Sequence, residues 1–204
     1  MNGAITPGAR RKIVTGIPGK TGIVWALGAA TGAFLWAQPT NYQNVIADID
    51  AENRRVLLNS SLKFTEVGEP VFVCPSATGG INWQATAYHP GTNALYAPTN
   101  NTCMNLTLNT FRDRAGAHHG SARIALEEAP DIDGQIGQFT AMDVATGETL
   151  WVHHQRAGIG GSVLTTGGGL VFVTDDARRF RAFDARTGDV RWEQSSTPAQ
   201  AGIR

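Results

Sequence analysis

The residue types that most often carry chemistry occur in this chain as isolated pairs. The histidine pairs His118-His119 and His153-His154 offer the side chain that most commonly binds metals. Neighbouring residues on a strand point to opposite faces, so each pair supplies one ligand at most. We therefore expect surface or insertion histidines. The stretch Asp131-Ile-Asp-Gly134 resembles the start of a calcium loop but lacks the distal glutamate, so we expect a turn there.

Other side chains that could act as acids, bases or nucleophiles also lack partners. Glu127-Glu128 has no second acid at the spacing that glycoside hydrolysis needs. Ser162 lies in Gly-Gly-Ser-Val-Leu, which is not the G-x-S-x-G form of a nucleophile elbow. The sequence therefore predicts neither a catalytic residue nor a metal site in this segment.

The two cysteines, Cys74 and Cys103, leave three alternatives open. They could form a disulfide, remain as buried thiols, or supply half of a metal site. No Cys-x-x-Cys, His-Glu-x-x-His or Cys/His cluster accompanies them, which argues against zinc. From the residues alone, a disulfide and free core thiols are equally favoured.

Two polar residues, Lys20 and Asn82, lie in glycine-flanked segments. Lys20 lies in Gly-Lys-Thr-Gly, and Asn82 lies in Gly-Gly-Ile-Asn-Trp. Taken by themselves, both residues are better explained as turn residues, so their interpretation depends on the fold that positions them.

The composition favours strands joined by tight turns. Lys+Arg and Asp+Glu are 17 each, and this zero net charge argues against a nucleic-acid partner. With 42% hydrophobic residues, disorder is not expected. Glycine, at 24 of 204 residues, is poor in helices and favourable in turns. The longest apolar-leaning stretch, 23–30, is far shorter than a membrane helix, so we expect no membrane span.

An internal repeat supplies the architecture. The segments 27–36, 142–151 and 183–192 align without gaps as apolar-Asp-x-x-Thr-Gly-x-x-x-Trp, with Gly28 replacing Asp in the first. A degenerate copy spans 89–96. The Asp side chain can bond backbone N–H groups two residues on, Gly accepts a positive φ, and Trp can pack between sheets and donate its indole N–H. The pattern predicts a hairpin ending in tryptophan.

The last repeat unit shows the complete strand pattern of a propeller blade. Four apolar strands are predicted within it, at 163–166, 170–174, 180–184 and 190–193. Four strands in roughly 40 residues is typical of a β-propeller blade. We predict an all-β fold, a partial propeller of about three to four four-stranded blades. The alternative is an unrelated sandwich that uses Thr-Gly turns.

The spacing predicts an incomplete ring. The stretch 100–135 is polar and weakly periodic, which indicates an insertion. A closed propeller needs at least about four blades. We therefore expect residues 1–204 to form one partial propeller domain, an arc of a larger ring. The remainder of that ring is then an expected partner.

The repeats resemble the tryptophan-docking motifs of the pyrroloquinoline-quinone (PQQ) dependent alcohol dehydrogenases. The resemblance is strengthened by the segments 19–25, 73–76, 79–90 and 161–172, whose order is similar to the second half of that family's eight-bladed domain. It covers nearly the whole chain. The combination Cys-Pro-Ser…Gly-Gly-x-Asn-Trp is its most specific part.

The resemblance implies roles for three residues. Lys20 matches the cation that contacts the quinone oxygens, Asn82 matches the asparagine that hydrogen-bonds the cofactor, and Trp83 would be structural or a wall of the pocket. The family's calcium ligands, catalytic aspartate, stacking tryptophan and vicinal cysteine pair have no match here. PQQ is therefore the implied cofactor, and Ca²⁺ or another metal would be bound by residues outside this segment.

The resemblance also bears on the cysteines and the compartment. Cys74 and Cys103 match a disulfide position of the family's methanol dehydrogenases. Closing a loop of about 30 residues would contribute roughly 3.5 kcal/mol. A disulfide implies a periplasmic location. The N-terminus has no apolar run after its basic residues and is not a secretory signal, so we expect it not to be the natural start of the protein.

Two functions follow from these expectations. The first is part of an alcohol dehydrogenase that passes hydride from an alcohol to PQQ, with a cytochrome c or a quinone as electron acceptor. Because this segment supplies neither metal ligands nor base, we expect it to be inactive alone. The second is a non-catalytic propeller that acts as a protein-interaction scaffold. The two differ in whether Lys20 and Asn82 converge on one pocket.

Overall fold

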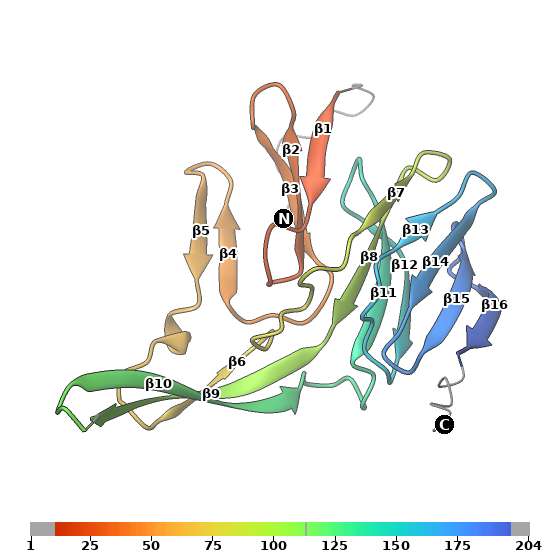
Figure 1. Cartoon of the computed structure of the whole chain (residues 1–204). Helices are drawn as coiled ribbons and strands as arrows, with labels where there is room; N and C mark the ends of the chain where they lie inside the picture. The colour runs from red at the N-terminus through yellow and green to blue at the C-terminus, as the bar shows by residue number, and fades with distance from the viewer. Residues whose placement is uncertain (1–10, 113, 197–204) are drawn as a thin grey trace, which may run out of the picture.

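The protein is described by a computed structural model that covers residues 11–112 and 114–196. Within these ranges the chain forms strands, turns and a single short 3-10 helix, η1 (Ser60–Leu62). No helix in the described part of the chain is long and apolar enough to cross a membrane. Figure 1 shows the strands gathered into small sheets that follow one another along an arc.

Three of the sheets are successive antiparallel blades. The first has the order β1-β2-β3, the second β12-β11-β8-β7, and the third β13-β14-β15-β16. Their strands are β1 (Ile13–Gly16), β2 (Ile23–Gly28), β3 (Phe34–Pro39), β7 (Ala87–His89), β8 (Ala94–Asn100), β11 (Gly137–Asp143), β12 (Thr149–Gln155), β13 (Leu164–Thr165), β14 (Leu170–Thr174), β15 (Arg179–Asp184) and β16 (Val190–Ser195). The predicted all-β propeller architecture is confirmed, and residues 11–112 contribute three strands to the first blade where four were expected.

The middle blade is covered on both faces because residues alternate along its strands. One face packs against the third blade, and the other packs against the first. The first of these cores contains Tyr96, Phe139, Trp151, Val171 and Phe183, among others. The second contains Val24, Trp36, Leu95, Met142 and Val144, among others. The neighbouring residues Leu95 and Tyr96 thus point to opposite faces: Leu95 packs against the first blade and Tyr96 against the third.

Each junction is closed by a tryptophan that lies on the glycine of the next blade's turn. Trp36 Nε1 donates to the carbonyl of Val144 at 3.2 Å, and Trp151 Nε1 donates to the carbonyl of Ala185 at 3.2 Å. A Cβ added at Gly147 would lie 2.7 Å from the Trp36 ring, so no larger residue fits there. The predicted indole donation is confirmed at both junctions.

The turn that receives each tryptophan forms as its sequence predicts. Asp143 Oδ1 accepts from the backbone N–H groups of Ala145 and Thr146, at 2.7 and 3.0 Å. Asp184 accepts in the same way from the two residues at the corresponding positions. The turn glycines have φ values of 76° at both Gly147 and Gly188. A side-chain-to-backbone turn therefore presents a flat glycine surface to the incoming ring.

The two outer blades each present one half of this contact. At one end, Trp192 is 46% exposed and contacts Phe180 edge-on at 5.8 Å. Phe180 in turn contacts Phe172 at 5.5 Å. At the other end, Gly32 has φ 68° like the docked turn glycines, but no described atom lies within 4 Å of its added Cβ. Among the described residues, the arc therefore ends in a half-exposed tryptophan at one side and an uncovered turn at the other.

Residues between the blades form a second region that projects from the arc. A hairpin pairs β4 with β5, and a three-stranded sheet has the order β10-β9-β6. These strands are β4 (Ile46–Asp50), β5 (Arg55–Leu58), β6 (Pro70–Val73), β9 (Thr102–Arg112) and β10 (His118–Glu128). The stretch 100–135, expected to be an insertion, holds the long β9–β10 hairpin, which extends away from the blades in Figure 1.

Candidate cofactor site

The loop that carries Asn82 packs directly on the loop that carries Lys20. Gly80 N donates to the carbonyl of Lys20 at 2.8 Å, and a Cβ added at Gly79 would lie 2.8 Å from Lys20 Cβ. A Cβ at Gly80 would lie 2.4 Å from Oδ1 of the buried Asn41. Two glycines are therefore needed for the first and second blades to meet here, and this contact brings Lys20 and Asn82 to adjoining stretches of backbone.

The side chains of the three predicted cofactor residues are exposed at this place. Lys20 Nζ donates to the carbonyl of Ala77 at 2.7 Å. Asn82 uses its backbone N–H to donate to Gln84 Oε1 at 2.9 Å, while its carboxamide has no hydrogen-bond partner among the described residues. The Trp83 side chain is 74% exposed. All three side chains are therefore accessible, and the loops that carry Lys20 and Asn82 touch through their backbones.

A cavity of about 230 Å³ opens beside Asn82, between the second and third blades. Its wall contains Asn82 and Trp83 but not Lys20. The lining residues are Thr78, Gly79, Ile81, Asn82, Trp83, Gln84, Asn100, Thr102, Ile136, Gly158, Gly160 and Asp176. The structure thus brings two of the three predicted residues into one cavity and leaves Lys20 just outside it.

Side chains that the sequence analysis missed fix the loops around the cavity. Asn100 Oδ1 accepts from Ile159 N at 2.7 Å, and its Nδ2 donates to the carbonyl of Ile159 at 3.2 Å. Gln84 Nε2 reaches the same carbonyl at 3.4 Å while its Oε1 holds Asn82 N. These two amides therefore tie the Asn82 loop to the 158–160 loop. In the sequence, the one local signal is a polar residue, Asn100, at the end of an apolar strand.

Asp176 lies on the far wall of the cavity and was also missed. Its backbone N–H donates to the carbonyl of Gly158 at 2.9 Å. Burial, and then the neighbouring charge of Asp175, raise the pKa of Asp176 above its ordinary value. Asp175 differs: burial alone would raise its pKa, but hydrogen bonds from Arg179 and the charges of Arg179 and Arg181 together lower it.

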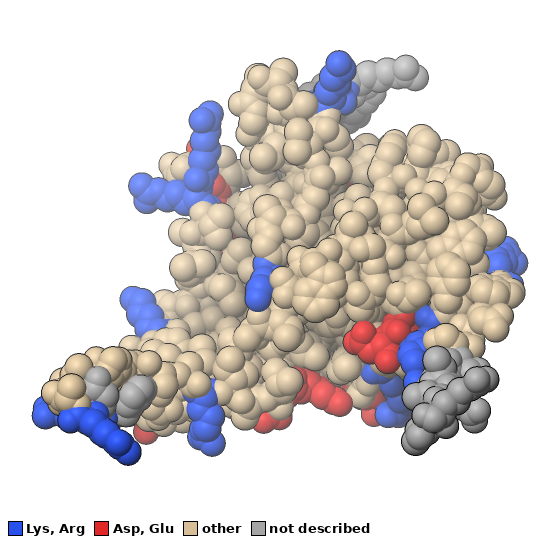
Figure 2. Space-filling model, viewed as in Figure 1, with Lys and Arg blue, Asp and Glu red and all other residues tan. Residues whose placement is uncertain are grey.

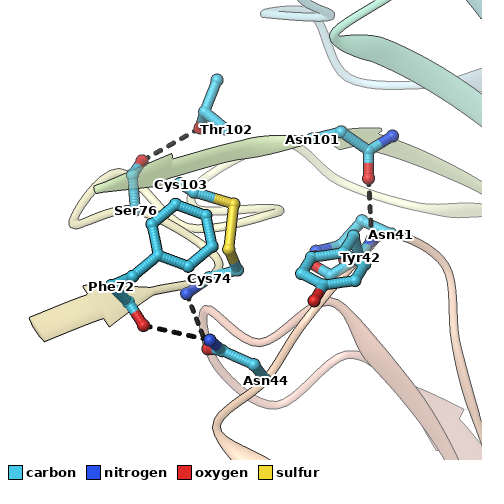
Figure 3. Close-up of a disulfide and its surroundings, with 9 residues drawn as sticks. All are labelled: Asn41, Tyr42, Asn44, Phe72, Cys74, Ser76, Asn101, Thr102 and Cys103. Atoms are coloured by element: carbon cyan, nitrogen blue, oxygen red, sulfur yellow. Dashed lines mark hydrogen bonds between the residues drawn. A yellow bond between two sulfur atoms is a disulfide. The ribbon is translucent and has the colours of Figure 1, made fainter. Parts of the chain in front are cut away.

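A disulfide anchors the start of the Asn82 loop, as Figure 3 shows. Cys74 and Cys103 are bonded and fully buried, so the pairing implied by the family resemblance is confirmed. Asn44 holds the adjoining backbone, since its Oδ1 accepts from Cys74 N at 2.8 Å and its Nδ2 donates to the carbonyl of Phe72 at 3.0 Å. This buried link joins Cys74, the residue after β6, to β9, and so fixes the chain shortly before the loop that lines the cavity.

The histidines and the acidic turn lie apart from the cavity. His118 and His119 are exposed on β10, and His154 is exposed on β12. The expectation of a surface histidine is wrong for His153, which is half-buried with its ring 5.0 Å from that of Phe183. It points inward because alternate residues of β12 face the third blade. No group of three or more His, Cys, Asp or Glu side chains that could hold a metal occurs in the described ranges.

The sequence matches a known protein family and several characterised proteins. A sequence-family profile, PQQ_2, described as outer membrane protein assembly factor BamB, matches residues 77–204. The chain belongs to the PQQ_2 family. It is also 30% identical over 176 residues to a lanthanide-dependent methanol dehydrogenase of Methylacidiphilum fumariolicum, covering 86% of this chain and 29% of that protein.

Further relatives are of the same kind. The chain is 35% identical over 126 residues to quinoprotein alcohol dehydrogenase PedH of Pseudomonas putida, covering 62% of this chain and 21% of that protein. The solved structure of a europium-containing methanol dehydrogenase superposes with a TM-score of 0.79 at 28% identity, over 95% of this chain and 34% of that one. The resemblance to quinoprotein alcohol dehydrogenases is confirmed. The chain spans about a third or less of the length of these relatives.

Proposed function

We propose that this chain is part of a PQQ-dependent alcohol dehydrogenase and supplies one side of its cofactor pocket. The observation that carries the proposal is the contact between the Lys20 loop and the Gly79-Gly80 turn. The contact joins two loops that are far apart in sequence, one carrying Lys20 and the other carrying Asn82, whose carboxamide side chain lines the cavity. A propeller that served only as a scaffold has no need of this convergence.

The donor set fits an ortho-quinone. Both the Lys20 ammonium and the Asn82 carboxamide can donate hydrogen bonds to quinone oxygens. The carboxamide has no hydrogen-bond partner among the described residues, and the Trp83 ring is uncovered beside it. When bound, PQQ accepts the hydride of the alcohol. Lys20 stabilises the negative charge that then develops on oxygen, Asn82 orients the ring system, and Trp83 excludes water from one side.

The rest of the enzyme is proposed from the family. The metal, Ca²⁺ or a lanthanide, and the base that takes the alcohol proton would come from blades outside this segment. The substrate is an alcohol, the electron acceptor is a cytochrome c or a quinone, and the compartment is the periplasm, which the buried disulfide supports.

The free ends of the arc support completion by further blades. Trp192 needs a Thr-Gly turn of the kind that receives Trp151, and the Gly32 turn has room for a tryptophan like Trp36. The aromatic surface at Trp192 resembles the one buried between the second and third blades. We infer that residues 1–204 form a partial propeller domain that docks the remaining blades at these two ends.

A chimaera tests the proposed cofactor role. Residues 11–196 replace the matching segment of the Methylacidiphilum methanol dehydrogenase, and the purified protein is examined for PQQ absorbance and for alcohol-dependent dye reduction. We expect both to be retained. We expect Lys20→Met and Asn82→Leu to lower the PQQ content and the rate by about tenfold or more, while Lys12→Met, an exposed cation outside the site, changes neither.

A folded chimaera that binds no PQQ would contradict the cofactor role. It would favour the non-catalytic scaffold, for which the description of the matching family profile is the specific support.

A further inference from the structure

We propose that the cavity beside Asn82 binds an organic ammonium group, held between the Asp176 carboxylate and the Trp83 ring. Both residues line the cavity. Asp176 is the one charged side chain among the lining residues, and the remaining polar lining consists of amides and hydroxyls.

The Asp176 carboxylate is available to a ligand. None of the described residues donates a hydrogen bond to it, and the arginines nearby are engaged elsewhere. Arg179 Nε and Arg181 NH1 both bind Asp175 Oδ2, at 2.8 and 3.0 Å. A carboxylate accepts hydrogen bonds and donates none, so the cavity offers a free negative acceptor.

Two glycines leave the space that the Asp176 carboxylate occupies. A Cβ at Gly160 would lie 2.2 Å from Asp176 Oδ1, and a Cβ at Gly158 would lie 2.6 Å from Oδ2. The 158–160 loop is itself held by Asn100 through two hydrogen bonds to Ile159. Side chains at the glycine positions would displace the carboxylate from the wall. The loop therefore holds a preorganised acceptor, which lowers the entropic cost of binding.

The composition of the cavity favours an ammonium over other ligands. The Trp83 ring is exposed. An ammonium group is attracted both to a carboxylate and to the face of an aromatic ring. A hard metal ion such as Ca²⁺ takes about six to eight oxygen ligands, and one carboxylate with a few amides is a poor set. A volume of about 230 Å³ is below the usual range for drug-sized ligands. A compact organic cation fits both the charge and the size.

This site deepens the proposed function by naming a substrate class. Asn82 and Trp83 belong both to this cavity and to the proposed cofactor region. An alcohol that carries an ammonium group could place its cation on Asp176 with its hydroxyl toward the cofactor. That last step rests on the proposed function, whereas binding of the ammonium does not.

A charge-only pair of probes tests the site. Choline and dimethylbutanol, in which carbon replaces the nitrogen, are titrated into the 204-residue chain without PQQ and followed by calorimetry. We expect choline to bind and dimethylbutanol to bind at least about tenfold more weakly, since the two probes share one shape and only choline carries the positive charge that attracts the carboxylate and the aromatic face.

Variants assign the binding to the two residues. Asp176→Asn keeps the shape of the side chain and is expected to weaken choline about tenfold. Trp83→Leu is expected to weaken it about threefold or more. Glu148→Gln, which removes an exposed carboxylate on another turn, should leave binding unchanged. Circular dichroism of each variant establishes that it is folded.

Three results would overturn the site: no choline binding to the folded chain, equal binding of the two probes, or a folded Asp176→Asn variant that binds choline as the parent does. The proposed function fails separately. If the chain bound choline but the chimaera bound no PQQ, the ammonium site would be supported and the proposed cofactor role would be rejected.

Discussion

At the scale of single residues, glycine decides where blades can touch. Gly188 and Gly32 both occupy the turn of the repeat and have positive φ values of 76° and 68°. A Cβ at Gly188 would lie 2.6 Å from the Trp151 ring, whereas one at Gly32 would meet nothing within 4 Å. The two positions thus share a backbone conformation and differ in docking, which makes them a matched pair.

Substitution of this pair separates backbone strain from docking. We expect Gly32→Ala to lower the free energy of unfolding by about 1–2 kcal/mol, the cost of a left-handed conformation for an L-residue. Gly188→Ala should cost a further 1–3 kcal/mol or so, because its methyl group overlaps the indole. Urea denaturation of the 204-residue chain measures both. Equal costs would show that Trp151 does not rest on Gly188 in solution.

The neighbouring aspartates Asp175 and Asp176 should respond to pH with opposite signs. Burial raises the pKa of Asp176, so its ionisation costs folding stability as the pH rises above the unfolded value of 3.8. Asp176→Asn should therefore raise the unfolding midpoint at pH 7 and have no effect near pH 3. Asp175 has a lowered pKa and stabilises the fold above that value, so Asp175→Asn should lower the midpoint at pH 7. Thermal unfolding at the two pH values distinguishes them, and a shift of the same sign in both variants would contradict this account.

At the scale of elements, the junction between β12 and β15 contains a half-buried histidine, His153. His153 contacts Phe183, and its pKa is lowered by burial first and then by Arg181 and other nearby positive charges. The unfolded chain takes up a proton near pH 6.5 that the folded chain resists.

Stability should consequently fall as the pH drops from 7 to 5. We expect His153→Gln to flatten this fall and His154→Gln, at the exposed neighbouring position, to leave it unchanged. Urea midpoints across the range provide the measurement. If both variants retained the full pH dependence of stability, a group other than His153 would be responsible for it.

The disulfide links β6 and β9 and holds the loop that leads to Asn82. Replacing Cys74 and Cys103 together by alanine should lower the free energy of unfolding by about 3.5 kcal/mol, from the freed loop of 29 residues. It should also speed hydrogen exchange at the Gly80 amide, which bonds to the Lys20 carbonyl. Unchanged exchange at Gly80 would mean that the cavity loop is held without the disulfide.

The sequence predicts some of these elements better than others. The blade turns are predictable because Asp, Thr and Gly act within a few residues of one another, and the predicted strands of the last blade lie close to those observed. The β9–β10 hairpin is not predictable in this way, since β10 is exposed along its whole length and its alternating apolar residues Ala122, Ile124 and Leu126 are covered by no core. Its pairing through β9 with β6 joins residues far apart in the chain.

In the candidate site too, residues in short local motifs could be predicted and residues brought together by packing could not. Lys20 and Asn82 could be proposed from short motifs, and those motifs carried a family resemblance. Gln84, Asn100 and Asp176 could not, because they meet only where two blades pack. Lys20 itself remains a prediction: it adjoins the Asn82 loop, and its ammonium lies on the Ala77 carbonyl.

At the scale of the whole molecule, charged side chains are few, at 17% of the residues. In Figure 2 the basic side chains gather toward the tip of the β9–β10 hairpin and other edges, the acidic ones lie mainly along the lower rim, and most of the face between them is uncharged. The outer face of the last blade adds the aromatic cluster of Phe172, Phe180 and Trp192. An uncovered aromatic surface of this kind promotes association.

The 204-residue chain alone should therefore self-associate through this face. We expect sedimentation velocity to show species larger than a monomer at micromolar concentration, and Trp192→Gln to shift them toward monomer. Trp83→Gln, which removes an even more exposed indole outside the cluster of Phe172, Phe180 and Trp192, is the control. A monomeric parent chain, or an equal response of the two variants, would show that the end of the arc is not the adhesive surface.

The middle blade's two covered faces set the order in which the molecule can come apart. Because both of its faces are covered, we expect amides of β8 and β11 to exchange with solvent only after both flanking junctions separate, and the outer blades to detach one at a time. Melting should accordingly proceed inward from the termini, as in other arrays whose units contact only their neighbours. Adding blades at either end would then raise the protection of residues that the new blades never touch.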